Sequence, residues 1–241
     1  MANLLRRLLP RGKAEEGASL DELIPAEIAR DAFHDAILRH AASDQVGTIL
    51  EIGSSAGAGS TSAFVAGILQ NPSRPRLCCM EVSATRFEAL RKAYLAHDFV
   101  HPFQLSSVPL SAFPAPGQVE QFYRAHATNL NHYPLATVLG WLKADMAYVA
   151  AHGQDLNGIR RIKEAEGIET FDLVLIDGSE FTGRAELPEV IGARVIMLDD
   201  INTYKNFENY FELKANPEYR LEQEDWTLRN GYAIFRKAGP A

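Results

Sequence analysis

The chain has 241 residues, enough for one medium-sized domain with an appendage, and it can bury a core without disulfides or structural metal ions. Hydrophobic residues make up 46% of it and charged residues 23%, which is ordinary for a globular protein. The formal net charge of −7 argues against non-specific binding to nucleic acid, because a phosphate backbone favours clustered lysines and arginines.

A basic segment opens the chain, and we expect residues 1–18 to form a flexible arm ahead of a single domain over residues 19–241. The arm has several arginines and leucines but lacks the longer apolar core and cleavage site of a secretory signal. It is either a frayed terminus or a weak docking contact with a membrane surface or a partner. No apolar run approaches the roughly 18 to 20 residues needed to span a bilayer, so we expect no transmembrane segment.

The two cysteines, Cys78 and Cys79, are adjacent in an apolar run. Neighbours on a strand point to opposite faces of the sheet, so we expect both to be buried and unbridged. A chain without a disulfide framework suits a reducing compartment, and we expect a cytoplasmic location.

Short apolar runs alternate with helical patterns along most of the domain. An amphipathic helix comes first, at about residues 25–42, where apolar residues recur at helical spacing. The predicted strands are the apolar runs at residues 46–52, 77–80, 100–105, 171–176 and 193–198, and helices are predicted at 61–69 and 84–97. Continuous apolar runs are typical of strands covered on both faces. The alternation therefore predicts an α/β fold with a doubly wound, mostly parallel sheet.

Two regions do not follow this alternation of strands and helices. Residues 107–169 contain several helical patterns but no predicted strand. We therefore expect a helical insertion that shapes a substrate pocket. Trp141 and the neighbouring tyrosines either line that pocket or pack inside the insertion. Near the end, residues 219–224 and 232–236 are predicted strands joined by a turn that contains Asn230-Gly231, which indicates an antiparallel hairpin.

A glycine-rich loop, LEIGSSAGAGST, follows the first predicted strand and opens a helix. Glycines let the backbone turn tightly and approach a ligand, and the helix presents the positive end of its dipole. The loop has no lysine for a P-loop and lacks the third glycine of a dinucleotide motif. The acid at the end of the strand, Glu51, would repel a pyrophosphate but suits a cationic ligand. S-adenosylmethionine is such a ligand, because it has an ammonium and a sulfonium and no phosphate.

A second acid, Glu81, ends the second predicted strand. An acidic residue about 20 to 30 positions after the glycine loop can accept hydrogen bonds from both hydroxyls of a ribose. NAD enzymes share this acid, so it does not discriminate between the two cofactors.

The loop resembles the first motif of the class I S-adenosylmethionine-dependent methyltransferases, in a lengthened form with Ser54-Ser55-Ala56 between its first two glycines. It is similar to loops of a bacterial branch related to cephalosporin hydroxylases and sugar O-methyltransferases. The resemblance covers about residues 45–237 outside the insertion, and implies a seven-stranded sheet whose last strand is antiparallel. The expected cofactor-binding residues are Glu51, Gly53, Ser54, Gly57, Gly59, Ser60 and Glu81.

Three aspartates follow two later strands: Asp177 ends one, and Asp199 and Asp200 end the next. Carboxylates near one crevice either attract a divalent cation or raise one another's pKa. Similar positions in the catechol-type O-methyltransferases hold magnesium, although the second pair there is Asp-Asn. In a metal-free alternative Asp177 or Asp200 is the general base for an alcohol. In a third alternative the aspartates have structural roles only: Asp199 caps the next helix and Asp177 belongs to a turn.

The sequence therefore predicts an S-adenosylmethionine-dependent methyltransferase, with a magnesium-like cation as a second expected cofactor. The expected reaction is O-methyl transfer to a hydroxyl of a small molecule or a sugar, with no nucleic acid partner. The sequence is compatible with a homo-oligomer. The alternatives are an NAD-dependent oxidoreductase or epimerase, and a noncatalytic binding protein that keeps the fold.

Overall fold

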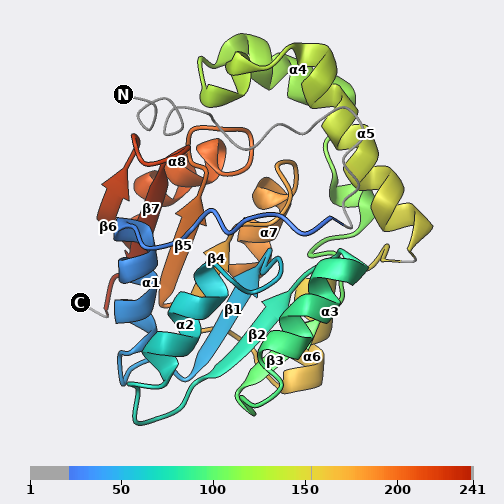
Figure 1. Cartoon of the computed structure of the whole chain (residues 1–241). Helices are drawn as coiled ribbons and strands as arrows, with labels where there is room; N and C mark the ends of the chain where they lie inside the picture. The colour runs from blue at the N-terminus through green and yellow to red at the C-terminus, as the bar shows by residue number, and fades with distance from the viewer. Residues whose placement is uncertain (1–21, 153, 240–241) are drawn as a thin grey trace, which may run out of the picture.

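The structure, a computed structural model, describes residues 22–152 and 154–239. These residues contain a seven-stranded sheet in the order β3-β2-β1-β4-β5-β7-β6 (Figure 1). The strands are β1 (Thr48–Ile52), β2 (Arg76–Met80), β3 (Val100–Phe103), β4 (Leu173–Ile176), β5 (Val195–Asp199), β6 (Tyr219–Asp225) and β7 (Tyr232–Lys237). β1 to β5 pair in parallel, and β7 pairs antiparallel with both β5 and β6. The predicted α/β class and the C-terminal hairpin are confirmed.

Helices cover both faces of the sheet, as Figure 1 shows. One layer contains α1 (Ala32–Ala41), α2 (Ser60–Ile68) and α3 (Ala84–Ala93), and the other α6 (Gly158–Glu166), α7 (Gly183–Val190) and α8 (Phe207–Ala215). Successive strand residues alternate between the layers: Ile49 packs in the first and Leu50 in the second. Cys79 and Cys78 divide in the same way, both buried and both free thiols, as expected.

The first helix is shorter than its apolar pattern suggests. It begins at Ala32 rather than near residue 25, because Arg30 has a left-handed φ of 56° that breaks the helical path. Asp31 then caps α1 by accepting hydrogen bonds from the backbone N–H groups of Phe33 and His34, at 3.0 and 2.9 Å. Residues 22–28 instead form a strap across the carboxyl ends of the strands (Figure 1). The arm predicted at residues 1–18 lies outside the described residues.

The predicted helical insertion divides into two parts. The helices α4 (Pro116–Ala125) and α5 (Leu135–Ala151), with short 3-10 turns beside them, share an apolar cluster of their own above the sheet (Figure 1). The last helix of the predicted insertion, α6, packs instead against the sheet in the second layer. It therefore serves as the crossover helix that leads to β4. In the part of the chain that the structure describes, no helix is both long and apolar enough to cross a membrane.

The close packing of α1 against α2 predicts that a larger side chain between them lowers the stability of the protein. A Cβ built on Gly67 of α2 would overlap the carbonyl oxygen of Leu38 and lie 2.7 Å from the Cβ of Ala41. We expect Gly67→Ala to lower the free energy of unfolding by about 1 to 3 kcal/mol, because the two helix backbones must separate. Denaturation in urea measures this change.

Gly140 of α5 is the matched control, since a Cβ there meets no atom within 4 Å. Gly140→Ala should leave stability unchanged or raise it by up to about 1 kcal/mol, through helix propensity alone. Equal effects of the two substitutions would contradict the close crossing of α1 and α2.

Candidate functional site

A cavity of about 710 Å³ lies at the carboxyl ends of the parallel strands. Its walls come from the β1–α2 loop, the ends of β2 and β4, the insertion, and the strap of residues 22–28. Ligands of doubly wound sheets bind at this edge. A second hollow, of about 750 Å³, lies at the opposite ends of the parallel strands, where residues before β4 and β5 line it. None of the sequence motifs reaches that second hollow.

Two glycines of the loop are required by packing inside the protein. Gly53 has φ +88°, and a Cβ there would overlap the backbone of Asp177 at the end of β4. Gly57 has φ +83°, and a Cβ there would lie 2.6 Å from the ring of Tyr94, whose hydroxyl donates to the Gly57 carbonyl oxygen at 2.6 Å. Both positions need glycine, because a side chain is strained at such φ values. Gly53 lines the cavity, whereas Gly57 is not on its described wall.

Polar groups of the loop face the cavity. Ser54 lines it while only 3% exposed, and its hydroxyl has no hydrogen-bond partner among the described residues. Gly59 and Ser60 also line it, at the start of α2. Within the described chain no side chain caps this end of α2, and its first turn has no acid. The positive end of the helix dipole is therefore available to an anionic group of a ligand.

Glu51 lies behind this loop rather than on the cavity wall. Its side chain is fully buried, and the Thr61 hydroxyl donates to its Oε2 at 2.7 Å. Burial raises the pKa of Glu51 above its ordinary value, and the nearby hydroxyls of Ser60 and Ser54 oppose that rise. In this structure Glu51 thus supports the loop from beneath. Direct contact between Glu51 and a cofactor stays a prediction.

Glu81 lies on the cavity wall at the end of β2. Its Oε1 accepts the backbone N–H of Ser83 at 2.8 Å. Burial raises the pKa of Glu81, and hydrogen bonding from Ser83 together with the Arg86 charge opposes the rise. Ser106 and Ser107 line the same cavity, with their hydroxyls donating to the Val108 carbonyl and to Glu186.

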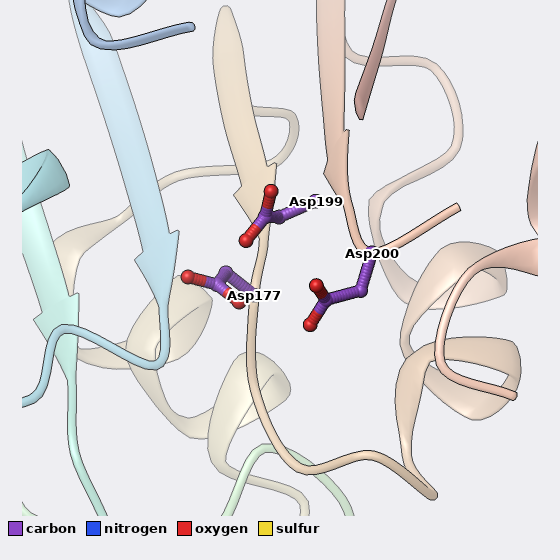
Figure 2. Close-up of side chains that lie close together, drawn as sticks. All are labelled: Asp177, Asp199 and Asp200. Atoms are coloured by element: carbon purple, nitrogen blue, oxygen red, sulfur yellow. The ribbon is translucent and has the colours of Figure 1, made fainter. Parts of the chain in front are cut away.

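The three aspartates come together as the sequence predicts. Figure 2 shows the side chains of Asp199 and Asp200, at the end of β5, pointing toward Asp177, which follows β4. One carboxylate oxygen from each lies within 4.8 Å of the others. Asp177 lines the cavity, but Asp199 and Asp200 are each only 1% exposed and are absent from its described wall.

Two cations that the sequence analysis did not select balance these carboxylates. Lys205 places its Nζ 2.7 Å from Asp177 Oδ1 and 2.7 Å from Asp200 Oδ2, and its side chain is fully buried. Arg229, in the hairpin turn, pairs with Asp199 Oδ1 at 3.0 Å and also with Asp31. Both cations lie in loops, where no periodic pattern indicates which way a side chain points.

The cluster as arranged does not fit a divalent ion. Such an ion binds carboxylate oxygens at roughly 2.0 to 2.6 Å. The ammonium of Lys205 already lies between the two oxygens that would bind it. Burial raises the pKa of Asp199 well above its ordinary value, with added repulsion from Asp200 and Asp177 and opposition from Arg229 and Lys205. The alternative in which Asp199 caps the next helix is not seen, because α8 begins at Phe207 and its N-cap residue is Asn206, which makes no side-chain cap.

The insertion supplies the opposite wall of the cavity. Tyr133 and Trp141 lie on it, with ring centroids 4.8 Å apart. Asp145 of α5 accepts a hydrogen bond of 2.5 Å from Ser179, in the loop after β4, and both residues line the cavity. The insertion therefore contributes to the pocket, as expected, and adds an acid that the sequence analysis did not single out.

Solved structures share this fold at low sequence identity. The O-methyltransferase from Bacillus cereus, in complex with S-adenosylhomocysteine, matches with a TM-score of 0.56 and 15% identity, over 89% of this chain and 84% of its own. The O-methyltransferase TomG from Streptomyces achromogenes, in complex with S-adenosylmethionine, gives 0.50 and 13%, over 88% and 82%. The S-adenosylhomocysteine-bound methyltransferase PaMTH1 from Podospora anserina gives 0.50 and 12%, over 88% and 81%.

No protein-family model and no curated protein sequence matches the chain. The structural matches show the fold alone: the chain has a Rossmann-like α/β fold similar to that of these methyltransferases.

The burial of Glu51 has a measurable consequence for stability. Because its pKa is raised in the folded protein, the folded state binds more protons than the unfolded state at pH values above the ordinary 4.5. Glu51 therefore lowers stability as the pH rises through this window. Glu51→Gln removes the ionisation, so the free energy of unfolding of the variant minus that of the wild type should increase from about pH 5 to about pH 7.5.

Urea denaturation of the wild type and of Glu51→Gln at the two pH values tests this. A difference for Glu51→Gln that stays flat, or falls, with rising pH would contradict a destabilising buried carboxylate.

Proposed function

We propose that this chain is an S-adenosylmethionine-dependent methyltransferase that acts on a hydroxyl of a small molecule. One observation carries the proposal: the glycine loop after β1 and the acid after β2 line a single cavity at the carboxyl ends of the strands. The fold supports it, because similar folds are found in the cofactor-bound methyltransferases described above.

The cavity wall offers groups that suit each end of the cofactor. Glu81 would accept hydrogen bonds from the ribose hydroxyls. Ser54 has an unpaired hydroxyl on the wall, and Gly59 and Ser60 open α2, where helix amides favour the carboxylate of an amino acid. When bound, the cofactor supplies an electrophilic methyl group on a sulfonium. Gly57 and Glu51 would act by holding the loop in shape.

The acceptor would lie between the acidic cluster and the insertion. Asp177 is on the wall and is the candidate general base for the acceptor hydroxyl. Asp200 does not line the cavity, and Lys205 links it to Asp177 by pairing with both carboxylates. The rest of catalysis is positioning, with Tyr133 and Trp141 providing apolar surface.

The charge of the wall favours some acceptors over others. Acidic side chains predominate on it, namely Glu22, Glu27, Glu81, Asp145, Asp177 and Glu180, against the basic Arg86. An acceptor bearing a phosphate or a carboxylate would be repelled at close range. A neutral or cationic hydroxylated molecule, including an uncharged sugar, suits the site best.

Cofactor binding tests the proposal without knowledge of the acceptor. Isothermal titration should show one S-adenosylhomocysteine bound per chain. Glu81→Gln should weaken binding at least about tenfold, because a hydrogen bond to a charged group contributes about 1.5 to 3 kcal/mol. Glu88→Gln, on the exposed face of α3, is the matched control and should bind like the wild type.

Titration with NAD⁺ distinguishes a methyltransferase from the main alternative, an NAD-dependent oxidoreductase or epimerase. Tighter binding of NAD⁺ than of S-adenosylhomocysteine would favour an oxidoreductase or epimerase. Equal affinities of the wild type and Glu81→Gln, with both proteins folded, would remove Glu81 from the cofactor site.

Methyl transfer distinguishes an enzyme from a noncatalytic binding protein. Labelled S-adenosylmethionine should transfer its methyl group to a member of a panel of neutral and cationic hydroxylated acceptors. Asp177→Asn should reduce the rate at least about a hundredfold, because general-base catalysis contributes roughly 10² to 10⁴. The exposed Asp44→Asn is the control and should keep the wild-type rate. Unchanged transfer by Asp177→Asn would exclude it as the base.

A further inference from the structure

A buried lysine, Lys205, bridges two carboxylates of the acidic cluster formed by Asp177, Asp199 and Asp200. The ammonium of Lys205 lies 2.7 Å from an oxygen of Asp177 and 2.7 Å from an oxygen of Asp200, so it joins the ends of β4 and β5. The side chain has no exposed surface, whereas lysine is almost never fully buried unless it is paired. A divalent ion bound by these two aspartates would need the same position.

The backbone on either side of Lys205 is fixed to the protein. The Lys205 N–H donates to Glu180 Oε1 at 3.3 Å. The next residue, Asn206, donates from its side chain to the carbonyl oxygens of Ile176 and Asp199, at 3.0 and 2.6 Å, and so ties the loop to the ends of both strands. Gly183 of α7 lies so close to the Lys205 carbonyl that a Cβ at that position would overlap it. The loop that carries Lys205 is therefore held against the ends of both strands.

The third carboxylate has its own cation. Arg229 pairs with Asp199, and it is held in turn by Asp31 at the start of α1. The three acids are thus matched by two cations that belong to the fold, and each acid has a cationic partner. A metal ion added to this arrangement would be repelled by both cations.

We propose that Lys205 takes the place of a divalent cation, so that the carboxylate cluster binds no metal in the wild-type protein. The lysine holds Asp177 at the cavity wall by linking it to Asp200, and is a positioning residue. Removal of the ammonium leaves Asp177 and Asp200 facing an open space and creates a divalent-cation site. This inference concerns the cluster itself and stands whether or not the chain transfers methyl groups.

Titration with Mn²⁺, followed by electron paramagnetic resonance of the free ion, tests the proposal on the full chain. The wild type and Asp200→Asn should show the same weak, non-specific uptake, because the cluster contributes no site to either. Lys205→Ala should bind one Mn²⁺ at least about tenfold more tightly than the wild type. Mn²⁺ should also raise the melting temperature of Lys205→Ala and not that of the wild type. Lys214→Ala, which removes an exposed lysine of α8, should behave like the wild type.

Two results would overturn the proposal. One is a single Mn²⁺ bound tightly by the wild type and lost in Asp200→Asn. The other is a folded Lys205→Ala variant with no greater affinity than the wild type. If Lys205→Ala does not fold, the comparison between the wild type and Asp200→Asn decides alone: loss of a tight site overturns the proposal, and identical weak uptake supports it. Titration with S-adenosylhomocysteine is independent of these outcomes, so a failure here is distinct from a failure of the proposed function.

Discussion

The site depends on the close approach of two strand ends. Gly53, after β1, packs against the backbone of Asp177, after β4, and only a residue without a Cβ fits there at φ +88°. The helix that follows β1 covers one face of the sheet, and the helix that follows β4 covers the other. The connections therefore diverge at this point and leave a crevice at the carboxyl ends of the strands. Residues after β1 and β2 form one side of the crevice, and residues after β4 form the other.

Charge balance is the second constraint. Carboxylates are rarely buried without cationic partners, because loss of hydration is unfavourable. Asp199 and Asp200 are almost inaccessible, and Asp177 is partly so, yet Lys205 and Arg229 reach all three. Because the ammonium of Lys205 belongs to the chain, the folded protein itself holds the carboxylates in this arrangement. A bound metal would instead make it depend on the supply of the ion.

Much of the architecture could be predicted from the sequence, because strands buried on both faces are apolar at consecutive positions and the glycine loop has a distinctive spacing. The details of the site could not. Lys205 and Arg229 lie in loops, and their direction depends on tertiary contacts with acids distant in the sequence. The sequence predicts Glu51 as a cofactor-binding residue but does not indicate that its buried side chain accepts a hydrogen bond from Thr61 behind the loop. The helical pattern before residue 32 was interrupted by Arg30, whose left-handed φ no periodicity indicates.

A crystal structure of the protein with S-adenosylhomocysteine would test the central claim most directly. The nucleoside should occupy the cavity between the β1–α2 loop and the end of β2, with its ribose hydroxyls hydrogen-bonded to Glu81 and its amino-acid end beside Ser54 and the start of α2. A nucleoside bound elsewhere, or a loop that accepts only the diphosphate of a dinucleotide in parallel soaks, would contradict the account.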